Sequence, residues 1–164
     1  MIRRAVIAFA VVANLVFADA LTKELAAGCL KGEAPVSVIG GFFNLAYVEN
    51  RGCAWGMFQG SATPLAFFAL AALVFLFWKR KSVFAAGEGA FSRFAAFSAE
   101  CLAYAGIAGN LIDRVARGYV IDFLDFHCMG SHFPCFNLAD AYITLAVVAM
   151  LSVSFADKTK QKRK

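Results

Sequence analysis

Two aspartates near the end of the chain are placed where a pair of carboxyl groups could act on one substrate. Asp122 lies in a short β-prone stretch, and Asp140 lies where a long apolar run begins. An ionised carboxylate at the edge of an apolar span costs free energy, so its presence there favours a functional role. Two carboxyl groups that share a proton provide one base and one acid, and such a pair can activate water. The two aspartates therefore predict hydrolysis.

Further polar residues gather near the same ends of the apolar runs. Asp19 and Lys23 are four residues apart, which places them on one face of a helix as an ion pair. Because every apolar run brings polar groups to one membrane depth, we expect a single polar site. The candidate supporting and substrate-binding residues are Asp19, Lys23, Asn50, Gly52, Asn110, Arg114 and Asn137.

Some of these residues also have a structural interpretation, which stays open at this point. Asn137 is suited to cap a helix that begins beside it, with Asp140 in the first turn favoured by the helix dipole. Asp113 and Arg114 are an adjacent acid and base on the face that carries Asn110, which suggests a structural ion pair. Asp122 could be a solvated loop carboxylate.

The elements that must position these residues are membrane helices. The chain has 164 residues, of which 61% are hydrophobic and only 16% are charged, and its mean hydropathy is +0.68. That composition indicates an all-α integral membrane protein rather than a soluble domain. Each of four apolar runs is near the ~17–25 residues that cross a bilayer as helix. The runs cover residues 5–21, 62–78, 94–112 and 138–155, and we expect residues 1–164 to form a single domain.

The two longer connecting segments carry strand signals. Val36–Ile39 and Phe42–Val48 are apolar runs separated by Gly40-Gly41, which predicts a hairpin. Tyr119–Leu124 is a further short β-prone run. A small extracytoplasmic β-sheet seated on four transmembrane helices accounts for all three. Within the third apolar run, Gly106 and Gly109 permit close packing of one helix on another.

The distribution of basic residues predicts the orientation in the membrane. If the four spans alternate, eleven of the sixteen lysines and arginines lie on one side, at the two ends of the chain and in the 79–93 loop. The positive-inside rule then places both termini and that loop in the cytoplasm. The basic tail has no aromatic residues interleaved with its charges, so we expect it to contact anionic lipid and not nucleic acid.

A metal site is one alternative to the carboxyl pair. His127, Cys128, His132 and Cys135 are residue types that bind zinc, but their spacing fits no standard zinc pattern. We therefore expect surface histidines and loop cysteines, with no metal. A disulfide between Cys128 and Cys135 is possible on the outer side, although no spacing requires it.

A small proton- or ion-coupled transporter is the second alternative. It would use Glu100, Asp140 and Asp19 as a carboxylate relay. Glu100 lies inside the third apolar run and is the least explained residue, either as a neutral acid that faces the bundle interior or as part of a proton path. A non-catalytic assembly subunit is the third. A relay should cross the membrane, whereas most acids here favour the outer side, which supports an enzyme.

Six blocks of residues, in this order, resemble lipoprotein signal peptidase (signal peptidase II), a family of bacterial membrane aspartyl endopeptidases. The resemblance covers nearly the whole chain. Cys53 and Trp55 stand where the family more often has alanine and phenylalanine, and neither is a catalytic position of the family. The blocks are Asp19-x-x-x-Lys23, Phe42-Phe-Asn-Leu-x-Tyr47, Asn50-x-Gly52-x-Ala54, Gly109-Asn110-x-x-Asp113-Arg114, Val120-x-Asp122-Phe123 and Phe136-Asn137-x-Ala139-Asp140.

The resemblance implies a function and a site. It implies four transmembrane helices in a bacterial inner membrane, with both termini cytoplasmic and the active site near the outer face. It implies cleavage of prolipoproteins just before a diacylglyceryl-modified cysteine, by Asp122 and Asp140, without metal or cofactor. Asp113 matches no catalytic position of the family. We expect membrane lipids as further partners, no nucleic acid, and a monomer. The supporting residues that it implies are Asp19, Asn50, Asn110, Arg114 and Asn137.

Overall fold

Four long helices and one small sheet make up the described part of the protein. The computed structural model describes residues 2–52, 60, 62–87 and 89–161, with side chains up to residue 155, so Cys53 and Trp55 lie outside the described residues. All four helices have a stretch long and apolar enough to cross a membrane. They are α1 (Ile2–Leu30), α2 (Ala62–Val83), α3 (Ala90–Arg117) and α4 (Leu138–Gln161).

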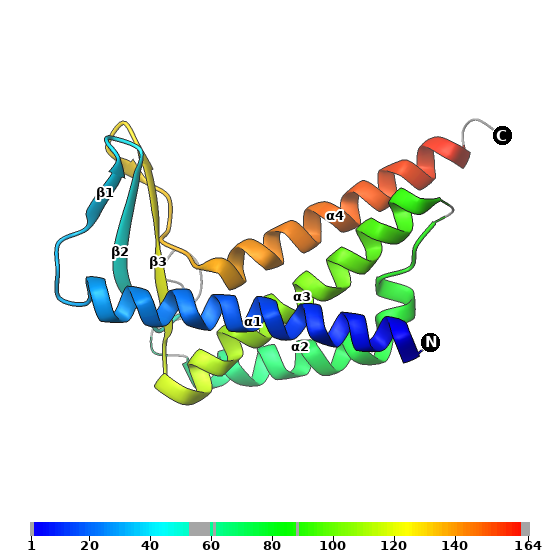
Figure 1. Ribbon diagram of the computed structural model, residues 1–164, viewed down its shortest axis with the longest axis horizontal. Helices are drawn as coiled ribbons and strands as arrows, with labels where there is room; N and C mark the ends of the chain where they lie inside the picture. The colour runs from blue at the N-terminus through cyan, green and yellow to red at the C-terminus, as the bar shows by residue number, and fades with distance from the viewer. Residues whose placement is uncertain (1, 53–59, 61, 88, 162–164) are drawn as a thin grey trace.

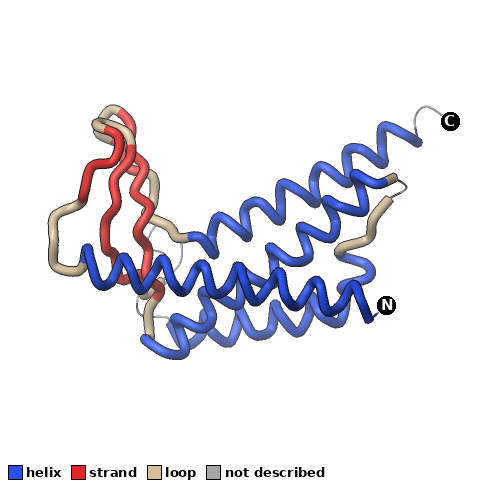
Figure 2. The backbone as a smooth tube through the Cα atoms, in the orientation of Figure 1, coloured by secondary structure: helices blue, strands red, loops and turns tan. Residues whose placement is uncertain are grey.

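The helices run together, with the sheet at one end of the bundle and both chain ends at the other (Figures 1 and 2). This arrangement confirms the predicted fold class. Two of the predicted spans begin where α2 and α4 begin, at residues 62 and 138. The helices continue past the apolar runs, and α1 extends to Leu30. Its last turns pack Ala26 and Leu30 against Ile121 and Phe123 below the sheet, so helix continues where hydropathy has already fallen.

The sheet is antiparallel, and its strands follow chain order. Gly41 takes a left-handed φ of 73°, which turns the chain from the first strand into the second and confirms the predicted hairpin. The strands are β1 (Val36–Ile39), β2 (Phe43–Asn50), β3 (Val120–Cys128) and β4 (Ser131–His132).

The pairing of β2 with β3 joins residues that are 70 to 83 positions apart in the chain. Val48 lies opposite Asp122, and Asn50 lies opposite Val120. The register shifts between Leu45 and Val48, which indicates a bulge or irregularity beside Asp122. Hydrophobic alternation could predict each strand, but this long-range register brings an asparagine from one segment to an aspartate of another.

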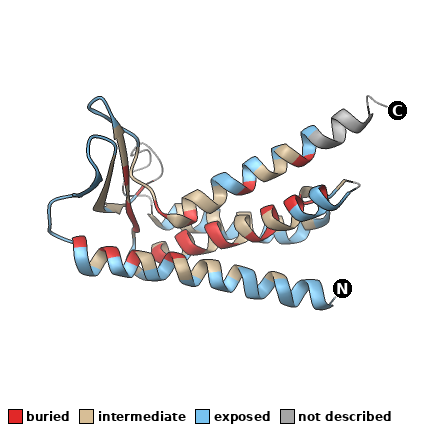
Figure 3. Ribbon diagram, turned by 45° about the horizontal axis from the view of Figure 1, so that its top comes forward, coloured by how far each residue is buried: buried red, intermediate tan, exposed pale blue. Residues whose placement is uncertain are grey.

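Helix α3 lies at the centre of the bundle, and buried residues concentrate along it (Figure 3). It packs most closely against α4, where a side chain at Gly106 would meet the Ala139 carbonyl oxygen at 2.5 Å. At Gly109 a side chain would meet an Asp19 carboxylate oxygen at 2.6 Å. The predicted role of the two glycines in close helix packing is therefore confirmed. No residue of α2 is buried within the protein, so its apolar surface is available to lipid.

Glu100 lies toward the end of the bundle that carries the chain ends. Its carboxylate pairs with Arg4 of α1 at 3.0 Å and with Arg80 of α2 at 3.4 Å. It does face inward, since its side chain is only 8% exposed, but it is held between two guanidinium groups. The carboxyl group is therefore part of an ion-pair cluster that links three helices.

Candidate active site

Asp122 is held by amide groups on both of its carboxyl oxygens. Asn50 donates to one oxygen at 2.8 Å, and Asn137 donates to the other at 2.6 Å. The side chain of Asn50 has a fixed orientation, because its own oxygen accepts the backbone N–H of Gly52 at 2.9 Å. Asp122 is 2% exposed and belongs to a strand, so it is not the solvated loop carboxylate of the structural interpretation.

Asp140 lies in the first turn of α4, and Asn137 caps that helix. The Asp140 backbone N–H donates to the Asn137 side-chain oxygen at 3.0 Å, while the Asn137 backbone N–H donates to the Asp140 carboxylate at 3.3 Å. These reciprocal bonds form a capping box, which confirms the predicted cap. The backbone N–H of Asn137 thus holds the Asp140 carboxylate while its side-chain nitrogen holds that of Asp122, so one asparagine fixes both carboxyl groups.

Asn110 and Lys23 lie behind the pair. Asn110 donates to the Asp140 carboxylate at 2.7 Å, and its oxygen accepts from Lys23 at 3.0 Å. Because a lysine only donates, it forces the Asn110 oxygen toward itself and the amide nitrogen toward Asp140. Lys23 also pairs with Asp19 at 2.8 Å, as its four-residue spacing predicted. Asp19 in turn accepts the backbone N–H of Ala139 at the start of α4.

The partner of Asp113 differs from the expectation. Asp113 pairs with Lys23 at 3.0 Å and with Arg117 at 3.2 Å, so the predicted pairing with Arg114 is wrong. Adjacent residues on a helix point about 100° apart, whereas residues four apart share a face. The four-residue spacing of Asp113 and Arg117 therefore predicts the ion pair that the structure contains. Arg114 instead donates to the backbone carbonyl oxygens of Asn110 and Gly52, each at 3.3 Å.

Burial changes the acidity of Asp122. Desolvation first, and then the negative charge of Asp140, raise the pKa of Asp122 to about 7, against the bonds from Asn50 and Asn137. The influence of Asp140 shows that the two carboxyl groups are electrostatically coupled. An aspartate that titrates near neutral pH can hold a proton under conditions in which an ordinary aspartate has lost it.

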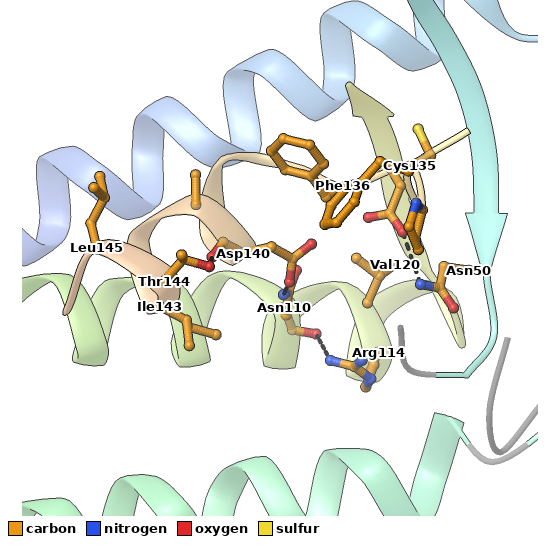
Figure 4. Close-up of a pocket in the computed structure, with 14 residues that line it drawn as sticks. Asn50, Asn110, Arg114, Val120, Cys135, Phe136, Asp140, Ile143, Thr144 and Leu145 are labelled. Atoms are coloured by element: carbon orange, nitrogen blue, oxygen red, sulfur yellow. Dashed lines mark hydrogen bonds between the residues drawn. The ribbon is translucent and has the colours of Figure 1, made fainter. Parts of the chain in front are cut away.

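A pocket of about 730 Å³ opens beside the two carboxyl groups. Figure 4 shows Asp140, Asn110, Arg114 and Asn50 along it, contributed by α4, α3 and the end of β2. Its remaining walls are mostly apolar. The polar groups are thus confined to one part of a hydrophobic cleft. The apolar lining includes Val120, Phe133, Pro134, Phe136, Ile143 and Leu145.

The residues of the metal hypothesis have other surroundings. Within the described part of the chain, no three histidine, cysteine, aspartate or glutamate side chains are grouped to hold a metal ion. His132 bonds to Asp125 at 2.9 Å and stacks on His127. Cys128 and Cys135 are both free thiols. Cys135 lines the pocket, but burial raises the pKa of its thiol to about 12, so it stays protonated and is a poor nucleophile.

The structure brings all nine candidate residues into one bonded network. Five of them line the pocket, and the other four brace those five from behind. Sequence reasoning assigned Asp113 the wrong partner and so missed that it closes the network through Lys23. The pocket-lining residues are Asn50, Asn110, Arg114, Asp122 and Asp140, and the bracing residues are Asp19, Lys23, Gly52 and Asn137.

Four membrane-length helices and two aspartates beside an apolar cleft, one of them buried, are the features of a membrane aspartic peptidase. Comparisons with known proteins agree with that class. The family model described as signal peptidase (SPase) II matches residues 11–156. The lipoprotein signal peptidase of Syntrophotalea carbinolica is 38% identical over 89% of each chain, and that of Desulforapulum autotrophicum is 36% identical over 90% of this chain and 91% of its own.

A relative from Staphylococcus aureus with the same name is 33% identical over 92% of this chain and 88% of its own. A solved bacterial membrane enzyme superposes with a TM-score of 0.74, at 31% identity over 96% of this chain and 92% of that one. A second has a TM-score of 0.66, at 32% identity over 88% and 89%. The chain belongs to the signal peptidase II family, and the transporter hypothesis has no support.

Proposed function

We propose that this peptidase cuts diacylglyceryl-modified prolipoproteins just before the lipidated cysteine, with Asp122 and Asp140 as its catalytic pair. The proposal rests above all on one observation: a single asparagine, Asn137, bonds to both aspartates at the edge of an apolar cleft. The relatives named lipoprotein signal peptidase support the substrate class. An apolar cleft suits a substrate whose cysteine carries acyl chains.

In the proposed mechanism, protonated Asp122 and ionised Asp140 act on one peptide bond. Asp140 takes a proton from water while the water oxygen bonds to the carbonyl carbon. Asp122 gives its proton to the carbonyl oxygen, which forms a neutral tetrahedral intermediate. Asp140 then passes its proton to the leaving nitrogen as the C–N bond breaks, and Asp122 regains the hydroxyl proton as the carbonyl re-forms. The raised pKa of Asp122 supports its assignment as the acid.

The remaining candidate residues position this pair or the substrate. Asn50 and Asn110 each hold one carboxyl group in place. Among the described residues, Arg114 bonds only to two backbone carbonyl oxygens, so its guanidinium can also bind a carbonyl of the substrate backbone. Lys23 and Asp19 fix the start of α4, on which Asp140 is carried.

The proposal includes a membrane orientation and a working unit. Both termini face the cytoplasm of a bacterial cell, and the cleft lies near the outer face of the inner membrane, where the lipid-modified substrate is. Residues 1–164 act as one domain and as a monomer, because every residue of the proposed site comes from one chain. Membrane lipids surround the bundle, and the reaction needs no metal, cofactor or nucleic acid.

The test is cleavage of a synthetic lipidated signal peptide by purified protein, with and without chelator. We expect Asp122→Asn and Asp140→Asn each to lower turnover on the order of 10²–10⁴-fold, because neither amide can transfer the proton. The double variant should be scarcely worse than either single, because the two act as a unit. Near-normal turnover in either single variant would refute the catalytic pair.

Asp125→Asn is the matched control. Asp125 lies on the same strand as Asp122 but bonds to Asn44 and His132, so turnover should stay near that of the parent protein. The same peptide without the lipid should be a poor substrate. Loss of activity with chelator that zinc restores would instead revive the metal hypothesis.

A further inference from the structure

A second cavity, of about 400 Å³, shares no lining residue with the cleft that contains the aspartates. It is formed by α1, α2 and α3 in the half of the bundle that carries the chain ends. Arg4, Arg80 and Glu100 form its polar end. The rest of the lining is mostly apolar, and includes Phe9, Val12, Leu73 and Phe77.

The polar end carries an excess of positive charge. Two guanidinium groups face the one carboxylate of Glu100. Arg4 contacts it through Nη2 and Arg80 contacts it through Nε. Their side chains remain 57% and 42% exposed, and the described residues provide no other hydrogen-bond partner for them. The remaining N–H groups are therefore free to bind an anion at the mouth of the cavity.

Deeper in the same cavity, the hydroxyl of Tyr104 is buried without a hydrogen-bond partner among the described residues. A buried hydroxyl that bonds to nothing costs free energy, so such groups are rare and call for an explanation. An oxygen of a ligand inside the cavity would satisfy it. Tyr104 lies one turn beyond Glu100 on α3, on the side that leads from the charged mouth into the apolar part.

The direction of the helices gives the cavity a polar and an apolar end. Along α1 it runs from Arg4 to Val12, which is about 12 Å of helix. Arg4 lies near the chain end, where lipid headgroups would be, and Val12 lies toward the bilayer interior. An anion alone would fill the mouth and leave the apolar part unused, and an uncharged lipid would leave the arginines unused.

We propose that this cavity binds an anionic phospholipid, with the phosphate on Arg4 and Arg80, an ester oxygen at the Tyr104 hydroxyl, and one acyl chain along α1 and α2. The site is separate from the aspartate pair, and the proposal does not depend on the proposed function. It makes this end of the three-helix junction a specific lipid site rather than general bilayer contact.

The test compares three probes on the full-length protein in a neutral detergent. We expect phosphatidylglycerol to raise the melting temperature and to stay bound in native mass spectrometry, at least about tenfold more tightly than phosphatidylcholine with the same chains. Inorganic phosphate should do neither. Equal retention of the two lipids, or an equal effect of phosphate alone, would overturn the proposal.

Three variants test whether the lipid binds in this cavity. Arg80→Gln should reduce phosphatidylglycerol retention to the level of phosphatidylcholine, whereas Arg93→Gln, an equal charge loss on an exposed part of α3, should not. Tyr104→Phe should raise the melting temperature without lipid, because it removes an unpaired buried hydroxyl, and should reduce the added stabilisation by lipid. If Tyr104→Phe leaves the lipid effect unchanged, or if Arg93→Gln weakens binding as much as Arg80→Gln, the assignment of this cavity is wrong.

Discussion

At the scale of single residues, the acidity of Asp122 sets the expected pH range of activity. The proposed acid must hold a proton, and the pKa of Asp122 is raised to about 7 by burial and by the nearby Asp140 charge. As the pH rises through that value the acid is lost, so kcat/KM should fall with a midpoint near pH 7. A pH–rate profile on the lipidated peptide would measure this limb.

Asn50→Ala should move the midpoint of this fall in kcat/KM to higher pH. The Asn50 amide stabilises the ionised form of Asp122, so its loss raises the pKa of Asp122 further and lets the acid survive to higher pH, by about one pH unit. Asn44→Ala is the control, since Asn44 makes the equivalent cross-strand bond to Asp125 away from the cleft. If the midpoint of the fall in kcat/KM is unchanged in Asn50→Ala, that fall does not reflect the titration of Asp122.

The residue types of the site could be predicted from the sequence, but their partners could be predicted only in part. The Asp19–Lys23 pair and the Asn137 cap follow local spacing rules, and both are confirmed. The predicted partner of Asp113 is wrong, and the sequence predicts no partner for Glu100. Glu100 bonds to residues 96 and 20 positions away, a distance that no local pattern encodes. The catalytic and supporting roles of the residues stay predictions.

At the scale of elements, the start of α4 has two separable tasks. Asn137 caps the helix through its oxygen and holds Asp122 through its nitrogen. Asn137→Ala loses both, so we expect the free energy of unfolding to fall by about 1–3 kcal/mol and activity to be lost. Asn137→Ser keeps a capping oxygen but is too short to reach Asp122 as the amide does.

The serine variant should therefore recover much of the stability and little of the activity. Thermal unfolding in detergent and peptide cleavage, measured on the same samples, would separate the two tasks. If activity returns together with stability in Asn137→Ser, the bond to Asp122 has no part in catalysis.

The contact between α3 and α4 depends on the absence of a side chain. In Gly106→Ala the new methyl group would meet the Ala139 carbonyl and the Ile143 side chain within 2.6 Å, so α4 must shift. We expect a loss of about 1–3 kcal/mol of stability and reduced turnover, because Asp140 moves with the helix. Gly28→Ala is the control, because nothing lies within 4 Å of that position on α1. Alanine there should be neutral or stabilising by up to about 1 kcal/mol, as measured by unfolding in detergent.

The strands illustrate the same division between local and long-range information. Their approximate positions and the Gly40-Gly41 hairpin follow from β-branched and aromatic runs and turn residues. β3 runs on to Cys128, past the predicted Leu124, because its second half pairs with Phe43 and Asn44 of β2 and with β4. Pairing partners, rather than intrinsic preference, decide where such a strand ends.

At the scale of the whole molecule, the basic residues predict the orientation. Both chain ends lie at the end of the bundle opposite the sheet (Figure 1), as four spans require. We expect engineered cysteines at residues 82 and 160 to react with impermeant reagents only from the cytoplasmic side, and one at residue 38 in β1 to react from outside. Labelling of intact cells and of inverted vesicles would measure this. Strong labelling of residue 82 or 160 in intact cells would reverse the proposed topology.

The bond from Asp19 to the Ala139 backbone joins the first helix to the last one. A ribosome makes α1 before α4, and Asn137 and Asp140 are both still absent from the nascent chain when Asp122 has been synthesised. A partly made chain therefore carries Asp122 without its partner or its bracing asparagine. The proposed pair is completed only when α4 enters the bilayer and docks on α1 and α3, so we expect the emerging chain to be inert toward peptide bonds until that docking has occurred.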